Sequence, residues 1–310
     1  MTDLIQKDLV LFPNSKINLG LRVINKRKDG FHDIQTLFVP IPIKDVMEIS
    51  PSEDDNTHLT VSGDKYSLPD NDINNDLCIK AYNLLKEEFD IKPVNIHLHK
   101  NIPSGAGLGG GSSDAAFVLK AMNKLCGLHL NSKTLAKYAS KIGSDCGSFI
   151  YEHPMYAEER GDLLFPISTQ FYDFFPDLTK PRMQEEKTEE IMFTEQGSEK
   201  AKALQLHKDT FLSQDGRFKW KIITLPQIHV STAEAYSNVC PDDSGDSLYS
   251  RLSEPIETWK DTVFNDFEKT VFKKHPEIKF VKDMLYEQGA IYASMSGSGS
   301  SVFGIFRLKK

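Results

Sequence analysis

The chain has 310 residues, of which 39% are hydrophobic and 26% are charged, and its formal net charge is −7. This length and composition are typical of a globular protein with one large domain or two moderate ones. The negative charge argues against a general nucleic-acid or membrane-surface binder, but it leaves room for one basic pocket that holds a small anion.

The cysteine pattern and the lack of long apolar runs bear on the cellular compartment of the protein. Cys78, Cys126, Cys146 and Cys240 form no C-x-x-C pair, so we expect neither a zinc site nor a redox couple. Scattered thiols are typical of a reducing environment. The first residues have no basic region before a long apolar run, and no run approaches the roughly 20 residues of a membrane span. We therefore expect a cytoplasmic protein without a signal peptide.

Residues 1–165 alternate between strand-like and helix-like patterns. Asp29-Gly30 is a strong turn signal between two strand-like runs. Apolar periodicity predicts strands over residues 17–23, 34–43, 46–49, 59–61 and 94–98, and helices over 75–88, 115–125 and 132–141.

The second half contains one segment of different composition. Residues 168–217 are rich in Glu, Lys, Gln, Thr and Ser with weak periodicity, which favours a flexible insertion or a surface helical hairpin. A strand is predicted over 219–225, a helix over 275–288, and a strand, glycine turn and strand over 290–306. Strands and helices in both halves predict an α+β fold.

The sequence IPSGAGLGGGSSDAA, residues 102–116, lies between a predicted strand and a predicted helix. Gly105, Gly107 and Gly110 match G-x-G-x-x-G, but a dinucleotide site needs an acid about 20 residues later, and residues 125–131 contain none. The Lys-Ser/Thr of a Walker loop is missing, and a protein-kinase glycine loop would return to a strand.

The physics of this stretch still favours phosphate. Glycines let backbone N–H groups converge on an anion, and the N-terminus of the following helix carries partial positive charge. Ser112 and Ser113 add hydroxyls suited to phosphate or magnesium. A plain tight turn or a linker is the alternative, but a linker would not separate a clean strand from a clean helix.

Three motifs together resemble the GHMP kinases (galactose, homoserine, mevalonate and phosphomevalonate kinases). They are the glycine stretch, FPNSKINLGL at residues 12–21, and ASMSGSGSSVFGIF at residues 293–306. The resemblance implies a two-domain α+β fold, with a left-handed β-α-β crossover in the N-terminal domain and a ferredoxin-like C-terminal domain. We expect domains at 1–165 and 219–310, with an atypical insertion at 166–218.

The resemblance implies two catalytic residues. Asp145 would be the base that accepts the proton of the attacking hydroxyl, and Lys16 would keep that carboxylate ionised and offset charge on the phosphoryl group. A turn acid and a surface lysine are the alternatives. Asn18, two residues after Lys16, would point the same way in a strand.

Three further motifs are similar to family members that act on a cytidine diphosphate compound: DGFH at residues 29–32, HVSTAEAY at 229–236 and NDFE at 265–268. His32 would read the edge of the base, Phe31 and Tyr236 would stack on its ring, and Thr232 would help to hold substrate. A turn histidine and two core aromatics are the alternatives.

ATP and Mg²⁺ are the cofactors that the resemblance implies. The expected ATP-binding residues are Lys100, Pro103, Gly105, Gly107, Gly109, Gly110, Gly111, Ser112 and Ser113, and the expected cleft motif is Gly297, Ser298 and Gly299. The lysine is otherwise a surface residue at a strand end and the second glycine turn a plain hairpin loop. No magnesium ligand cluster stands out.

The chain also departs from the family pattern at Asp76, Gly147, Ser148 and Glu159. We therefore keep three functions open: a kinase for a small cytidine diphosphate substrate, another GHMP kinase acting on mevalonate, homoserine or a sugar, and a catalytically impaired nucleotide-binding homologue. A monomer or a homodimer is expected, with no nucleic-acid or membrane partner.

Overall fold

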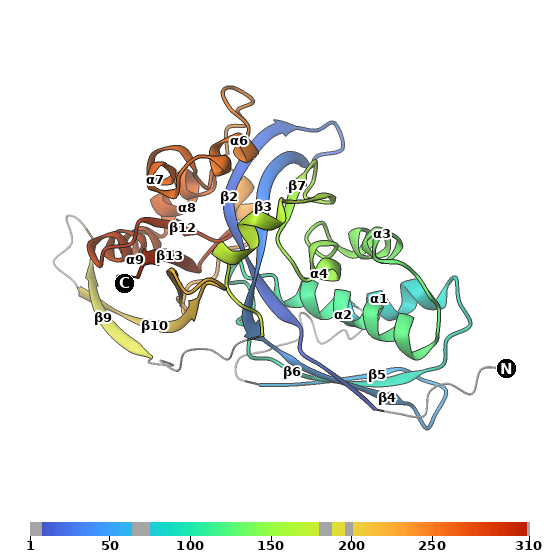
Figure 1. Ribbon diagram of the computed structural model, residues 1–310. Coiled ribbons are helices and arrows are strands. Elements are labelled where there is room, and N and C mark those ends of the chain that lie inside the picture. Colours follow the sequence, from blue (N-terminus) through green and yellow to red (C-terminus); the bar gives the residue numbers. More distant parts are fainter. Residues whose placement is uncertain (1–7, 64–74, 180–187, 196–200, 238, 309–310) are drawn as a thin grey trace. The chain divides into compact units, whose positions relative to one another are not determined.

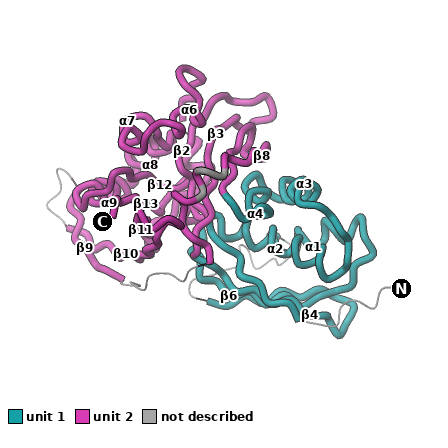
Figure 2. Tube along the Cα trace, viewed as in Figure 1, with its two compact units in different colours: residues 1–15, 43–104, 109–153 teal, residues 16–42, 105–108, 154–310 magenta. Residues whose placement is uncertain are grey.

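The computed structural model describes residues 8–63, 75–179, 188–195, 201–237 and 239–308. The chain divides into two compact units (Figure 2), of which unit 1 comprises residues 1–15, 43–104 and 109–153, and unit 2 comprises residues 16–42, 105–108 and 154–310. The expected boundaries at residues 165 and 218 stay a prediction.

Unit 1 is one sheet covered by helices (Figure 1). Its sheet has the order β1-β4-β6-β5, with β1 at Leu9–Leu11, β4 at Val46–Pro51, β5 at His58–Ser62 and β6 at Val94–His99. Its helices are α1 at Leu77–Lys86, α2 at Gly110–Leu125, α3 at Ser132–Ile142 and α4 at Ser148–Tyr151. The parallel pairing of β5 with β6, with α1 between them in the chain, is a β-α-β crossover. Strands and helices share one apolar core.

Unit 2 begins with two long strands. β2 at Asn14–Lys26 and β3 at His32–Lys44 are joined by the turn predicted at Asp29-Gly30, where Gly30 adopts φ 88°. β7 at Met155–Glu158 and β8 at Leu163–Pro166 complete a sheet of order β2-β3-β7-β8.

The second sheet of unit 2 corrects a prediction. It has the order β12-β13-β11-β10-β9, and both β9 at Glu189–Thr194 and β10 at Ala201–Leu212 come from the segment expected to be flexible or helical. Leu204 and Leu206 of β10 are fully buried, while Ala203, Gln205 and His207 beside them are exposed. The helical-hairpin interpretation is therefore wrong for the described part of that segment, and its residues 180–187 and 196–200 lie outside the described residues.

The remaining strands of this sheet are β11 at Phe218–Thr224, β12 at Tyr292–Met295 and β13 at Val302–Arg307. The described helical elements of unit 2 are η3 at Thr169–Phe174, α5 at Thr232–Tyr236, α6 at Leu248–Ser253, η4 at Ile256–Thr258, α7 at Trp259–Thr262, α8 at Glu268–Lys274 and α9 at Pro276–Glu287. α9 starts at a proline and packs Ile278, Val281 and Leu285 into the core of the second sheet.

Outside residues 168–217, every predicted strand and helix is present, with ends shifted by a few residues. The largest shift is at α2, which starts five residues earlier than expected, inside the glycine stretch. Among the described residues, no helix combines the length and apolarity of a membrane span.

Candidate active site

The glycine stretch has the backbone of an anion-binding loop. Gly105, Gly107 and Gly109 adopt φ of 67°, 75° and 73°, which residues with a Cβ rarely adopt. A Cβ added to Gly107 would lie 2.1 Å from the carbonyl oxygen of Ser296. Gly109 caps α2 without a side chain, so the first amides of a 16-residue helix have no side-chain cap. The loop therefore offers N–H groups and a helix dipole to an anion.

Residues 105–108 of this loop belong to unit 2, where the C-terminal glycine turn holds them. The Ser301 amide donates to the Ala106 carbonyl at 3.1 Å, and the Ser296 hydroxyl donates to the Gly107 carbonyl at 2.8 Å. The expected cleft motif, Gly297–Gly299, lies between these two serines. Two glycine motifs that are far apart in the sequence are thus brought together.

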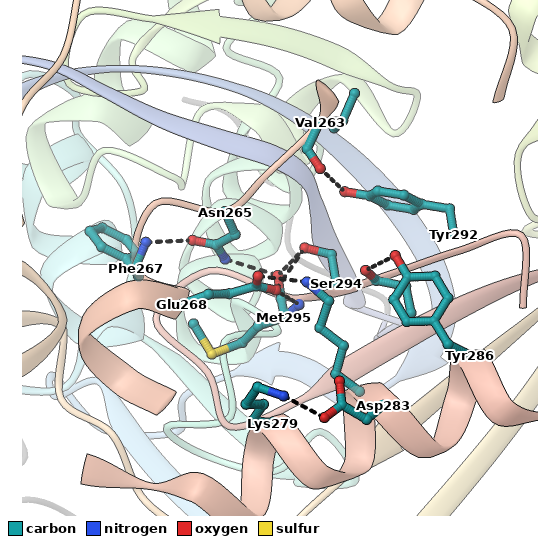
Figure 3. A network of polar contacts seen from close by, with 12 residues as sticks. Val263, Asn265, Phe267, Glu268, Lys279, Asp283, Tyr286, Tyr292, Ser294 and Met295 are labelled. Carbon is teal, nitrogen blue, oxygen red and sulfur yellow. Dashed lines mark hydrogen bonds and ion pairs between the residues drawn. The ribbon is translucent and has the colours of Figure 1, made fainter. Parts of the chain in front are cut away.

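Hydrogen bonds with Asn265 and Glu268 fix the backbone just before the glycine turn (Figure 3). The Asn265 side-chain amide donates to the carbonyl of Met295 at 2.9 Å. It also donates to the carbonyl of Gly297 at 2.8 Å. The buried carboxylate of Glu268 accepts from the Met295 amide at 2.9 Å and from the Ser294 hydroxyl at 3.2 Å. The sequence signalled Asn265 and Glu268 only as part of a family motif, and gave no hint of this supporting role.

Lys16 and Asn18 lie on one face of β2, as their spacing predicts. Both are buried, at 3% and 2% exposed, and the Lys16 ammonium donates to Asn18 Oδ1 at 2.5 Å. It also lies 3.5 Å from the Gly107 carbonyl oxygen and 5.2 Å from the centre of the Phe38 ring. The Asn18 side chain in turn donates to the Thr36 hydroxyl at 3.0 Å. This face therefore directs a buried ammonium toward the phosphate loop.

Ser296 is a site residue that sequence reasoning missed. Besides donating to Gly107, its hydroxyl accepts the amide N–H of Asn18 at 3.2 Å, so one side chain joins β2, the loop and the C-terminal turn. These partners are 278 and 189 residues away in the chain. The only available signal was its place in the SGSGSS turn.

His32 and Tyr236 form the aromatic part of the site in unit 2. Their rings are stacked, with centroids 4.6 Å apart and planes at 19°, and Phe267 packs edge-on against Tyr236 at 4.6 Å. Burial, with a smaller effect of Lys26, lowers the pKa of His32. At neutral pH its ring is therefore uncharged and presents one donor and one acceptor nitrogen.

Phe31 and Thr232, which were also predicted to contact the substrate, are exposed. Phe31 is 54% exposed, and its ring lies 5.4 Å from the Arg160 guanidinium. Thr232 is exposed at the start of α5, next to the capping residue Ser231. His32 itself occupies one face of Tyr236, so the predicted stacking of a base between Phe31 and Tyr236 stays a prediction.

Lys100 belongs to unit 1, where two carboxylates bind it. Its ammonium contacts Asp45 and lies 2.5 Å from Asp114, and all three side chains are almost completely buried. A Cβ added to Gly110 would lie 3.3 Å from the Lys100 ammonium, so this charge lies next to the first residue of α2. Asp45 also accepts the Asn101 amide at 2.5 Å. Lys100 therefore ties α2 to the sheet of unit 1.

The Lys100 cluster has one more carboxylate than ammonium groups. Burial raises the pKa of Asp114 to about 8, although the neighbouring Lys100 lowers it, and Asp45 raises it further. Although burial opposes the charge on Lys100, Asp114 and Asp45 raise its pKa. The lysine is therefore locked in its charged form.

The serines of the loop differ in access. Gly111 is exposed and Pro103 and Ser112 are half-buried, whereas Ser113 is fully buried, and its hydroxyl makes no hydrogen bond within the described part of the chain. Burial raises the pKa of the Cys146 thiol to about 12, although the neighbouring Ser112 lowers that pKa. Ser112 is therefore the more accessible hydroxyl.

Asp145 follows α3 in unit 1 and is half-buried. Its carbonyl accepts the amide of Ser148 at 3.1 Å and the hydroxyl of the same residue at 2.8 Å. Ser148, a departure from the family pattern, thus fixes the backbone of the expected base. Lys16 lies in unit 2, and its pairing with Asp145 stays a prediction.

Family models and proteins of known name both match this chain. The family models described as GHMP kinases N terminal domain and GHMP kinases C terminal match residues 76–154 and 249–310. A protein of Cytophaga hutchinsonii named 4-diphosphocytidyl-2-C-methyl-D-erythritol kinase is 41% identical over 301 residues, which cover 97% of this chain and 93% of that protein. A Parabacteroides distasonis protein of the same name is 41% identical over 96% of this chain and 92% of its own length. The chain belongs to the GHMP kinase family.

Solved structures agree with this assignment. A crystal structure of 4-(cytidine 5'-diphospho)-2C-methyl-D-erythritol kinase has 26% identity and a TM-score of 0.64, covering 96% of this chain and 89% of that one. The mevalonate kinase of Methanococcus jannaschii, at 15% identity and a TM-score of 0.57 over 97% and 92% of the two chains, shares the fold. The family, the two-domain GHMP kinase fold and the small-molecule kinase class predicted from the sequence are confirmed.

Two departures of this GHMP kinase have local structural explanations. Glu159, where the family pattern has glycine, adopts φ 54°, so the left-handed backbone is kept with a side chain that disfavours it. Asp76 caps α1, where its carboxylate accepts the Cys78 amide at 2.7 Å. Neither residue needs a catalytic role to explain its presence.

Proposed function

We propose that this GHMP kinase transfers the γ-phosphate of ATP to the 2-hydroxyl of 4-diphosphocytidyl-2-C-methyl-D-erythritol, a step of non-mevalonate isoprenoid precursor synthesis. The relatives that carry this name match nearly the whole chain. The observation that carries the substrate assignment is His32, held in place by its stack on Tyr236, because a neutral imidazole presents one donor and one acceptor nitrogen to the edge of a cytosine.

In this proposal the chain supplies position and charge rather than covalent chemistry. The amides of residues 105–111 hold the ATP phosphates, and Lys16 offsets charge on the transferred group from the face that also carries Asn18. Asp145 accepts the proton of the substrate hydroxyl. Lys100, held by Asp45 and Asp114, positions the start of α2.

Mg²⁺ accompanies ATP in the proposal. Magnesium prefers oxygen ligands, keeps several waters, and takes few protein ligands beside the phosphates. The accessible Ser112 hydroxyl in the first turn of α2 fits such a ligand, and the described residues contain no cluster of three His, Cys, Asp or Glu side chains that would hold the ion alone. When bound, the ion neutralises charge on the β- and γ-phosphates.

Substrate competition tests the assignment. ADP release should depend on the cytidyl substrate, with no comparable release for mevalonate, homoserine or galactose, and CDP should inhibit competitively against that substrate. His32→Ala should raise KM for the cytidyl substrate while leaving KM for ATP unchanged. Turnover of mevalonate or homoserine without inhibition by CDP would instead favour another kinase of the family.

The Asp145→Asn variant tests the proposed catalytic role. Loss of the proton acceptor should lower kcat by about 10²- to 10⁴-fold without preventing binding of an ATP analogue. Absence of turnover in the parent protein, with the nucleotide still bound, would support the alternative of an impaired nucleotide-binding homologue.

A further inference from the structure

Unit 2 contains a cavity of about 290 Å³ that the proposed kinase site does not use. Its walls are largely aromatic and include Tyr156, Phe174, Phe218, Tyr249 and Trp259. The rings pack edge to face: Phe174 lies 4.8 Å from Phe218 and 5.6 Å from Trp259, and Tyr156 lies 5.6 Å from Tyr249, measured between ring centroids. Such a wall favours a flat apolar body.

The cavity lies on the opposite face of β3 from Lys16. Leu37 lines it, whereas the neighbouring Thr36 and Phe38 contact Asn18 and Lys16. Because successive strand residues point to opposite faces, one strand separates the cavity from the proposed catalytic face. The described residues that line the cavity include none of the predicted site residues.

One hydroxyl in the cavity wall has no hydrogen-bond acceptor among the described residues. Tyr156 is 5% exposed, and its hydroxyl donates to no acceptor within the described part of the chain. Burial raises its pKa to about 12, and the nearby Tyr249 amide only partly offsets this. The hydroxyl therefore stays protonated. A buried hydroxyl without a partner costs about 1–3 kcal/mol, so an acceptor oxygen on a ligand would relieve that cost.

Two arginines contribute to the lining. Arg217 and Arg307 have side chains that are 64% and 54% exposed, and their guanidinium carbons lie 5.9 Å and 5.3 Å from the centre of the Phe218 ring. Asp215 binds the Nε of Arg217, and Glu257 binds one Nη of Arg307. Neither carboxylate lines the cavity. Since a guanidinium has five N–H donors, each arginine keeps donors for a second anion.

We propose that this cavity binds a small, flat aromatic carboxylate that carries an acceptor oxygen at the end opposite the carboxylate. The rings would hold the apolar body, Tyr156 would donate to the acceptor oxygen, and the arginines would bind the carboxylate. One acid, Glu254, also lies in the lining, which leaves the two arginines in excess. A cavity of about 150 Å³ holds a benzene, so this one has room for two fused rings.

Isothermal titration of the full chain with 6-hydroxy-2-naphthoate tests the proposal. We expect saturable binding at one site that neither CDP nor an ATP analogue displaces. Removal of the oxygen in 2-naphthoate should weaken binding about fivefold, and removal of the carboxylate in 2-naphthol about tenfold. Absence of saturation up to the solubility limit, or displacement by CDP, would overturn the proposal.

Variants assign the contacts. Tyr156→Phe should weaken 6-hydroxy-2-naphthoate about fivefold and leave 2-naphthoate unchanged. The double variant Arg217→Gln/Arg307→Gln should weaken both carboxylates about tenfold and leave 2-naphthol unchanged. Lys279→Gln removes an exposed cation on α9 and serves as the control that should change nothing. Equal affinities in all three variants would show that the probe binds elsewhere.

Discussion

The two lysines of the proposed site lie in different surroundings. Lys100 of unit 1 is held between Asp45 and Asp114 in a cluster that is closed to water. Lys16 of unit 2 donates to Asn18 Oδ1, lies close to the Gly107 carbonyl and faces the phosphate loop. We propose two tasks from these contacts: Lys100 fixes the start of α2 on the sheet of unit 1, and Lys16 acts on the reacting phosphate.

The largest effect is expected from Lys100→Met. This substitution leaves two carboxylates buried without their cation, which typically costs about 3–5 kcal/mol of unfolding free energy. Urea unfolding measures the loss, and Lys92→Met, at an exposed position in the same unit, should stay within about 0.5 kcal/mol of the parent. A stable Lys100→Met protein with a strongly raised KM for ATP would instead make Lys100 an ATP ligand.

Lys16→Met should lower kcat strongly and change the free energy of unfolding less than Lys100→Met does. Loss of a charge aimed at the transferred phosphate should lower kcat by about 10²- to 10³-fold, while the unfolding free energy changes less than in Lys100→Met. Steady-state kinetics and urea unfolding on the same preparations make this comparison. A large loss of stability with normal kcat in the remaining folded protein would reverse the roles assigned to the two lysines.

Asp114→Asn sharpens the account of the Lys100 cluster through its pH dependence. In the unfolded chain this carboxyl ionises near pH 4, whereas the folded protein holds its pKa at about 8. Ionisation of the unfolded state therefore lowers stability as pH rises from about 4 to 8. The variant lacks this penalty, so its stability relative to the parent should increase by at least about 1 kcal/mol between pH 5 and pH 8. A pH-independent difference would contradict the raised pKa of Asp114 in the folded protein.

The smallest effect is expected from Glu159→Gly, in the turn between β7 and β8. Relief of the left-handed backbone should outweigh the entropy that glycine gains on unfolding, and thermal unfolding should show a gain of about 0.5–1 kcal/mol. The lost contact with Arg27, 3.9 Å away at the surface, contributes little. Because kcat should not change, this variant also controls for general effects of stability on activity.

Local signals account for what the sequence predicted correctly. The glycines and serines of residues 105–113 indicated a backbone phosphate site, and strand alternation placed Asn18 on the face of Lys16. The partners of Lys100 were not predictable, because Asp45 lies 55 residues away and nothing in its neighbourhood marks it. Ser296 was missed for the same reason. β10 was missed because its exposed face is so polar that Leu204 and Leu206 gave little periodicity.

The most direct test of the central claim is a double-mutant cycle on kcat with Lys16→Met and Asp145→Asn. If the two side chains act together on the transferred phosphate and the attacking hydroxyl, the double variant should lose little more than the worse single variant. Losses that multiply in the double variant would show that the two residues act independently, and would contradict the claim that one lysine and one aspartate form the catalytic couple.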